Sequence, residues 1–131
     1  MARKFAREAL MKLLYEKDVA GEHHKESLLA LIDEYKLNAN DEKYIKEILF
    51  SMDEEQSKID GYIEKYAKGW TVDRMSKVDL AILRLAIYEI LYKEDIPYGV
   101  SINEAVELAK NYGNEKSSSF INGILGNFVR M

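Results

Sequence analysis

Residues 78–92 form a segment that, as a helix, is apolar around nearly its whole circumference. Its only polar residues are Asp79, Arg84 and Glu89, whose spacing of five places them on different sides of a helix. A helix of this kind is buried on all sides, so the segment predicts a central helix around which the rest of the chain packs. It is too short and too interrupted by charge to cross a bilayer.

Apolar residues recur at helical spacing in the other segments as well, and no segment alternates with the period of two expected of a half-buried strand. Gly21 predicts the end of the first helix, and the polar cluster at 38–41 predicts a turn and an N-cap. The acidic run at 53–55 predicts either a break in a long third helix or a solvated face of it. We predict an all-α fold of about seven helices.

The boundaries of the helix after the central segment follow from three local signals. Pro97 excludes the α conformation at the residue before it, so the central helix ends beforehand. Ser101, three residues before Glu104, matches a capping box and predicts that the next helix begins there. Gly113 predicts a left-handed C-cap at its end.

Composition indicates one globular domain. The 131 residues include a single proline and no linker rich in glycine, serine or proline. The absence of cysteine excludes disulfides and thiolate metal sites and fits a reducing cytoplasm. Charged residues interrupt the first seventeen residues, so no secretory signal is expected.

Residues suited to catalysis are scarce. His23 and His24 are adjacent in a turn and cannot share the helical i, i+4 ligand geometry, so we interpret them as an incidental pair rather than a metal site. No nucleophile elbow, P-loop or dinucleotide fingerprint is present. We therefore expect no enzyme activity and no cofactor.

Charge is distributed unevenly along the chain. Residues 1–17 contain five basic and two acidic side chains, a net charge of +3, whereas the whole chain carries −4. Arg3, Lys4 and Arg7 place at least two cations on one helical face, where they would contact phosphates without reading bases. The alternative is that this basic arm, residues 1–17, is a solvated helix face.

A second candidate site precedes the last helix, at residues 116–120. Lys116 and three serines beginning at Ser117 place backbone N–H groups, hydroxyls and the positive end of a helix dipole together, a natural anion site. Phe120 at its edge is suited to stacking on an unpaired base. The alternatives are simple N-capping by the serines and a core position for Phe120.

Four blocks in fixed order resemble the NusB family of transcription antitermination factors. They are residues 83–89 (LRLAIYE), 95–97 (DIP), 102–105 (INEA) and 120–125 (FINGIL). The basic first helix with its Leu14-Tyr15 pair, and the Trp70, Arg74 and Val78 pattern, are also similar to the family. The similarity covers nearly the whole chain.

The resemblance implies a fold, a function and partners. The fold would be one domain of two packed helical subdomains, at about residues 1–68 and 69–131. The function would be to bind single-stranded boxA RNA of nascent ribosomal RNA transcripts together with a small-subunit ribosomal protein, NusE. The complex would then join other Nus factors on RNA polymerase and suppress termination. Members occur as monomers and as homodimers, which leaves a homodimer open.

The resemblance also assigns roles to residues. Arg3, Lys4 and Arg7 correspond to the RNA-gripping arm. Phe120 corresponds to a base-contacting aromatic, and Lys116 and Ser117 lie in the loop that flanks the RNA. On the ribosomal-protein interface, Asp79 corresponds to an acidic position, with Tyr15 near the same region. From the residues alone, Asp79 either pairs internally or faces another protein.

Two other functions compete with this interpretation. One is a helical protein–protein adaptor whose basic arm is incidental, which predicts partner binding that is insensitive to RNA. The other is the NusB-like accessory domain of ribosomal RNA methyltransferases, which is disfavoured because the sequence contains no glycine-rich nucleotide-binding domain.

Overall fold

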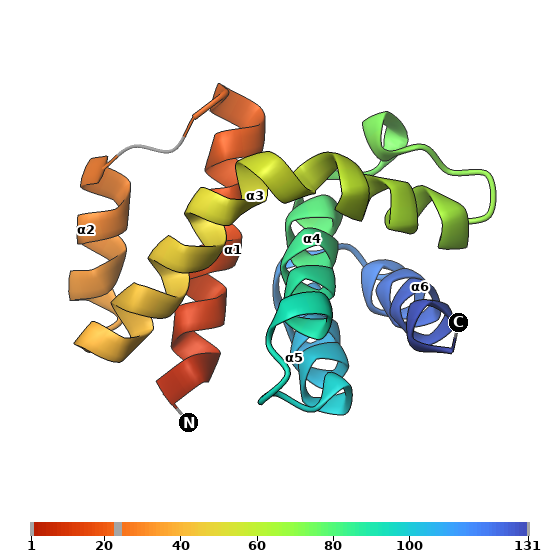
Figure 1. Cartoon of the computed structure of the whole chain (residues 1–131). Coiled ribbons are helices and arrows are strands. Elements are labelled where there is room, and N and C mark those ends of the chain that lie inside the picture. The colour runs from red at the N-terminus through yellow and green to blue at the C-terminus, as the bar shows by residue number, and fades with distance from the viewer. Residues whose placement is uncertain (1, 23–24, 131) are drawn as a thin grey trace. The chain divides into compact units, whose positions relative to one another are not determined.

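The computed structural model describes residues 2–22 and 25–130, with no account of the side chain of residue 2 (Figure 1). His23 and His24 lie outside these residues, and so does their interpretation as an incidental pair. The described chain forms six α-helices and one short 3₁₀-helix, η1 (Val72–Arg74), without strands. The all-α prediction and the expected number of helices are confirmed.

The chain divides into two compact units, Met1–Glu54 and Glu55–Met131. The division falls inside the long helix α3 (Ala39–Tyr66), whereas the sequence suggested a division after that helix, at about 68/69. The acidic run 53–55 is continuous helix, so the predicted break is wrong. The alternative of a solvated face holds, because Asp53 and Glu54 are exposed.

Unit 1 consists of α1 (Ala2–Ala20), α2 (Lys25–Glu34) and the first part of α3. α1 ends as predicted at Gly21, whose φ of 87° suits glycine. Asn38 caps α3, because its Oδ1 accepts the N–H of Asp41 at 2.9 Å and the Asp41 carboxylate accepts the N–H of Asn38 at 3.3 Å. The apolar core residues of this unit include Leu10, Leu13, Ile45 and Ile48.

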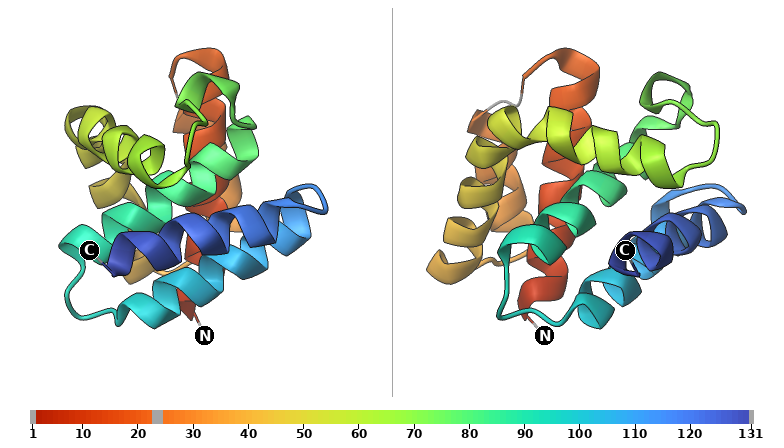
Figure 2. Two further views of the ribbon diagram at one scale, coloured as in Figure 1. Left: turned by 90° about the vertical axis from the view of Figure 1, so that its right-hand side faces the viewer. Right: turned by 45° about the vertical axis from the view of Figure 1, so that its right-hand side comes forward.

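Unit 2 is built around α4 (Lys77–Tyr92), which contacts both α5 (Tyr98–Tyr112) and α6 (Ser117–Val129). α5 and α6 lie side by side as an antiparallel pair (Figure 2). Every residue of α4 from Asp79 to Glu89 is buried. The prediction of a central helix buried on all sides is therefore confirmed.

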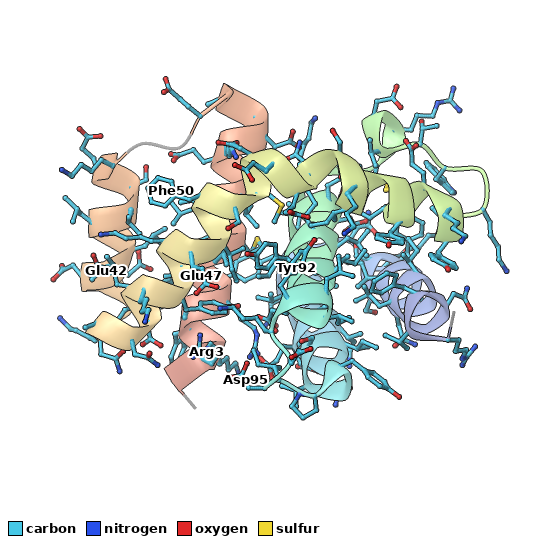
Figure 3. All side chains as sticks on the ribbon, in the orientation of Figure 1. Arg3, Glu42, Glu47, Phe50, Tyr92 and Asp95 are labelled. Carbon is cyan, nitrogen blue, oxygen red and sulfur yellow. The ribbon has the colours of Figure 1, made fainter. Side chains whose placement is uncertain are left out.

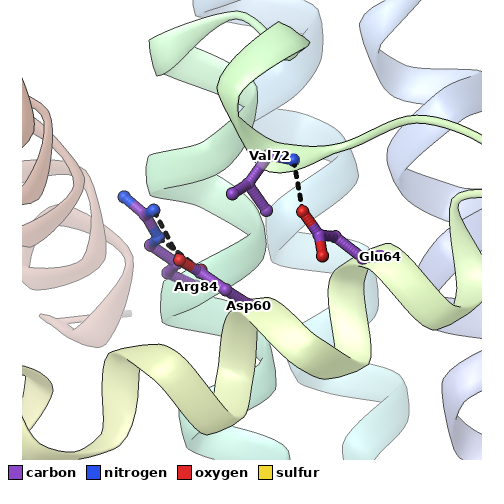
Figure 4. Close-up of polar contacts among 4 residues, drawn as sticks. All are labelled: Asp60, Glu64, Val72 and Arg84. Carbon is purple, nitrogen blue, oxygen red and sulfur yellow. Dashed lines mark hydrogen bonds and ion pairs between the residues drawn. The ribbon is translucent and has the colours of Figure 1, made fainter.

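Two of the three polar residues of α4 are satisfied by different elements. The Arg84 guanidinium donates from Nε and Nη2 to the two carboxylate oxygens of Asp60 on α3, at 2.8 and 2.9 Å (Figure 4). Glu89 accepts a hydrogen bond of 2.7 Å from the Ser101 hydroxyl of α5. These contacts fasten α4 to its neighbours at two points, as expected for buried polar groups.

The predicted capping box at Ser101 is wrong. α5 begins earlier, at Tyr98, with Pro97 at its N-cap, because the φ of −58° at proline is ready for a helix start. Ser101 is therefore buried in the first turns of the helix, where its hydroxyl serves Glu89 rather than a free N–H. Buried Glu89 needs a donor, and this requirement decides the position of Ser101.

Gly113 ends α5, but its φ of −91° is not left-handed, so the predicted conformation is wrong. Space explains the glycine instead. A Cβ at this position would lie 2.4 Å from Oγ of Ser117 and 2.9 Å from the carbonyl oxygen of Ala109. Ser117 thus packs directly on the backbone at the end of α5.

We expect Gly113→Ala to lower the free energy of unfolding by about 1–3 kcal/mol, because the new methyl group overpacks against Ser117. Gly123→Ala on α6 is the matched control, since a Cβ there meets nothing within 4 Å. It should be neutral or raise stability by up to about 1 kcal/mol through helix propensity. Urea denaturation followed by circular dichroism measures both, and equal effects would contradict the steric explanation.

Candidate nucleic-acid interface

The three cations of the basic arm differ in exposure. Lys4 is exposed at the start of α1. The guanidinium of Arg3 lies over the ring of Tyr44, 4.2 Å from its centroid, and is half-buried (Figure 3). Arg7 is only 6% exposed and has partners within the protein. Among these three residues, Lys4 presents its charge most fully to solvent.

The start of α6 has the features of an anion site. Lys116 is exposed at the N-cap, and the backbone N–H groups of Ser118 and Ser119 donate to none of the described residues. Free N–H groups and the positive end of the helix dipole attract anions. The arrangement agrees with the anion site expected from sequence.

Ser117 has a supporting position in this site. It is 1% exposed, and its Oγ accepts the N–H of Asn114 at 3.0 Å. The predicted alternative of a structural serine therefore describes its hydroxyl. Whether Ser117 also contacts RNA stays a prediction.

Phe120 lies at the edge of the protein surface with a second aromatic residue beside it. Its half-buried ring meets the ring of Trp70 edge to face, with centroids 6.1 Å apart and planes at 72°. Trp70 is 51% exposed in the turn after α3. The two rings form an accessible aromatic corner, which is the type of surface on which unpaired bases stack.

The aromatic corner belongs to the wall of a cavity of about 560 Å³, which lies within unit 2 at the N-terminal ends of α4 and α6. This volume falls in the range of small-molecule sites. The cavity brings together Asp79, Lys116 and Phe120, which the sequence had assigned to two different surfaces. Its lining consists of Trp70, Arg74, Met75, Ser76, Asp79, Asn114, Lys116, Ser119 and Phe120.

Asp79 is the third polar residue of α4 and differs from the other two. It is 6% exposed, its N–H donates to the Ser76 side chain at 3.0 Å, and its Oδ1 is buried without a hydrogen bond from any described residue. Of the two alternatives from the sequence, the structure supplies no internal partner for Oδ1. A buried acceptor left unsatisfied costs about 1–3 kcal/mol.

Tyr15 is 40% exposed on α1 and so belongs to unit 1, whereas Asp79 belongs to unit 2. The accessibility of the Tyr15 ring agrees with an interface role. The assignment of both residues to a protein interface stays a prediction.

The model of the NusB family matches residues 2–130. The chain belongs to the NusB family. It is 51% identical over 131 residues to the transcription antitermination protein NusB of Acetivibrio thermocellus, covering 100% of this chain and 90% of the relative. The match extends over nearly the full chain, as the resemblance of the four blocks predicted.

Solved structures of NusB proteins share the fold. The structure of T. maritima NusB superposes with a TM-score of 0.85 at 33% identity, over 98% of this chain and 90% of that chain. A chain from the crystal structure of antitermination factors NusB and NusE in complex with dsRNA gives 0.85 at 28% identity, over 98% and 96%.

Some residues of the NusB-type cavity escaped the reasoning from sequence. Trp70 and Arg74 were noted only as part of the family pattern, and Ser119 only as one of a run. A usable signal was present, since Trp70 is the only tryptophan of the chain and directly follows Gly69, whose φ is +99°. An aromatic residue in a tight turn is exposed, and exposed aromatics mark binding surfaces.

Other kinds of site find no support within the described residues. No group of three or more histidine, cysteine, aspartate or glutamate side chains there is placed to hold a metal ion. None of the described helices has the length and apolar character needed to span a membrane.

Proposed function

We propose that this NusB-family chain is a transcription antitermination factor without enzyme activity. It acts in the cytoplasm, where it binds boxA RNA of nascent ribosomal RNA transcripts together with the ribosomal protein NusE. The complex then joins other Nus factors on RNA polymerase. Family membership over residues 2–130 supports this function. So does the similarity to a chain from a structure of NusB and NusE with RNA.

The observation that carries RNA binding is the grouping at the start of α6. Exposed Lys116, the free N–H groups of Ser118 and Ser119, and the accessible ring of Phe120 supply a cation, two donors and a stacking surface within one helical turn. Phosphate contacts and base stacking are the two contributions on which single-stranded RNA binding depends.

A titration of labelled RNA tests the function. Fluorescence anisotropy is measured with boxA-like and scrambled RNA of equal length, each with and without the ribosomal protein. We expect tighter binding to boxA-like RNA and further tightening by the ribosomal protein. Partner binding without RNA affinity under either condition would favour the helical adaptor instead.

Lys4 provides a quantitative test of the arm. Lys4→Ala should weaken binding to all RNA sequences and reduce the slope of log affinity against log salt by about 0.7, the value for one single-strand phosphate contact. Lys25→Ala is the control, because Lys25 is equally exposed in the same unit but lies on α2. An unchanged slope in Lys4→Ala would leave the arm as a solvated helix face.

We do not extend this test to Arg7, because its burial gives it a structural role in α1. Replacing a buried, paired arginine would disturb the fold and RNA binding together.

A further inference from the structure

The cavity of unit 2 has a feature that phosphate binding and stacking on Phe120 leave unexplained. Its wall combines an apolar part, made by Trp70, Met75 and Phe120, with one carboxylate, Asp79. The carboxylate is more than nine-tenths buried, and its Oδ1 receives no hydrogen bond from the described residues. A cavity with aromatic walls and one acceptor lacking a donor is shaped for a flat ligand that carries an N–H group.

The aromatic walls fit a single unpaired base. The rings of Trp70 and Phe120 stand at 72° to each other, so a planar ligand that stacks on one ring meets the other with its edge. Both of these contacts are favourable aromatic geometries. Trp70 would therefore be a second ring for the RNA, beside the Phe120 ring already assigned to it.

The carboxylate adds a chemical preference among bases. Cytosine and adenine carry an exocyclic amino group, which can donate to a carboxylate oxygen. Uracil has no amino group, and its single N–H donor stands between two carbonyl oxygens that repel a carboxylate. A carboxylate in the wall thus favours amino-bearing bases.

The charge around the cavity suits an RNA strand despite the aspartate. Arg74 and Lys116 are exposed residues of the cavity lining, and the free N–H groups of Ser118 and Ser119 lie at the start of α6. These groups offer partners to the phosphates on either side of an inserted base. The aspartate itself lies below them, 6% exposed.

We propose that this cavity receives one unpaired RNA base that carries an exocyclic amino group. The base stacks in the corner of Trp70 and Phe120 and donates from its amino group to Asp79. The proposal rests on the proposed function, since it assumes that RNA is the ligand, and it adds a base preference and two residues, Trp70 and Asp79, to the RNA surface.

The chain contains a built-in reporter for this test, because Trp70 is its only tryptophan. The full-length protein is titrated with hexacytidylate and hexauridylate. Trp70 emission reports occupation of the cavity, and anisotropy of end-labelled RNA reports total binding. We expect saturable quenching by hexacytidylate and an affinity at least about ten-fold above that for hexauridylate, as a charge-assisted hydrogen bond provides.

Asp79→Asn is the decisive variant. Asparagine has the same shape, and its side chain offers a donor as well as an acceptor, so the preference for cytidine over uridine should fall to near unity. Glu107→Gln is the matched control, because it removes one negative charge from an exposed position on α5 and should leave the preference unchanged.

The outcomes separate this proposal from the proposed function. RNA binding by anisotropy without a change in Trp70 emission, or with a preference that survives in Asp79→Asn, would overturn the base pocket and leave the RNA-binding function intact. If the ribosomal protein alone changes Trp70 emission and Asp79→Asn weakens that complex, the cavity belongs to the protein partner and the proposal fails. Absence of RNA binding, even with the ribosomal protein, would overturn both.

Discussion

Arg84→Ala is expected to lower the free energy of unfolding by about 3–5 kcal/mol, because it leaves the Asp60 carboxylate without its cation. The Arg84 side chain is 6% exposed and the Asp60 side chain 18%, so water replaces little of the lost interaction. The two parallel hydrogen bonds between them make this the strong form of an ion pair. Urea denaturation of the variant and the parent measures the loss.

Two controls separate this buried pair from ordinary surface charge. Lys46→Ala breaks the exposed pair with Glu42 on the same helix, α3, and should cost about 0.5 kcal/mol or less. The double substitution Arg84→Met with Asp60→Leu replaces the pair by apolar side chains and should recover most of the stability. If Arg84→Ala costs no more than Lys46→Ala, the pair does not hold α3 to α4.

The burial of α4 could be predicted from sequence because the pattern admits one solution. A helix with apolar residues on every side is stable only inside the protein, whichever elements surround it. The sequence did not reveal which elements satisfy its polar residues. Arg84 pairs with Asp60, which is 24 positions away, and no local rule connects the two residues.

The start of α5 shows where a local pattern fails. Ser101 and Glu104 have the spacing of a capping box, but Pro97 begins the helix earlier and Glu89 takes the serine hydroxyl. A buried carboxylate needs donors more than an exposed helix end does, since water can serve the exposed end. This competition depends on the packing of α4 against α5, which the sequence pattern does not contain.

The basic arm contained a signal that sequence reasoning overlooked. Arg7 was grouped with Arg3 and Lys4 as a phosphate contact, yet it precedes Leu10 by three positions and Leu14 by seven. Those spacings place all three on one helix face, and both leucines are buried. Helical periodicity alone could therefore have predicted the burial of Arg7.

The cavity is different, because its residues are close only after folding. Trp70, Asp79 and Phe120 come from a turn, from the first turn of α4 and from the first turn of α6. The sequence identified Phe120 and Asp79 separately, through the serine run and the isolated acid. Their common cavity results from the packing of α4 against α6.

Phe120 and Phe128 lie two turns apart on α6, and alanine substitutions should separate RNA binding from packing. Phe128 is 3% exposed and packs against the rings of Tyr62 and Tyr66, with centroids 5.1 and 6.2 Å away. Phe128→Ala should therefore cost about 3–5 kcal/mol of stability, as for other core aromatics. Its effect on RNA binding should follow only from the unfolded fraction.

Phe120→Ala should give the opposite result. Its ring is half-buried and its aromatic contact is with exposed Trp70, so the loss of stability should be about 1 kcal/mol, the value of one aromatic pair. The affinity for boxA-like RNA should fall by about 1–3 kcal/mol through the lost stacking surface. Thermal melting and anisotropy titration on both variants measure the two effects. If both variants melt early and bind RNA alike once folded, Phe120 is a core residue and its assignment to the RNA surface is wrong.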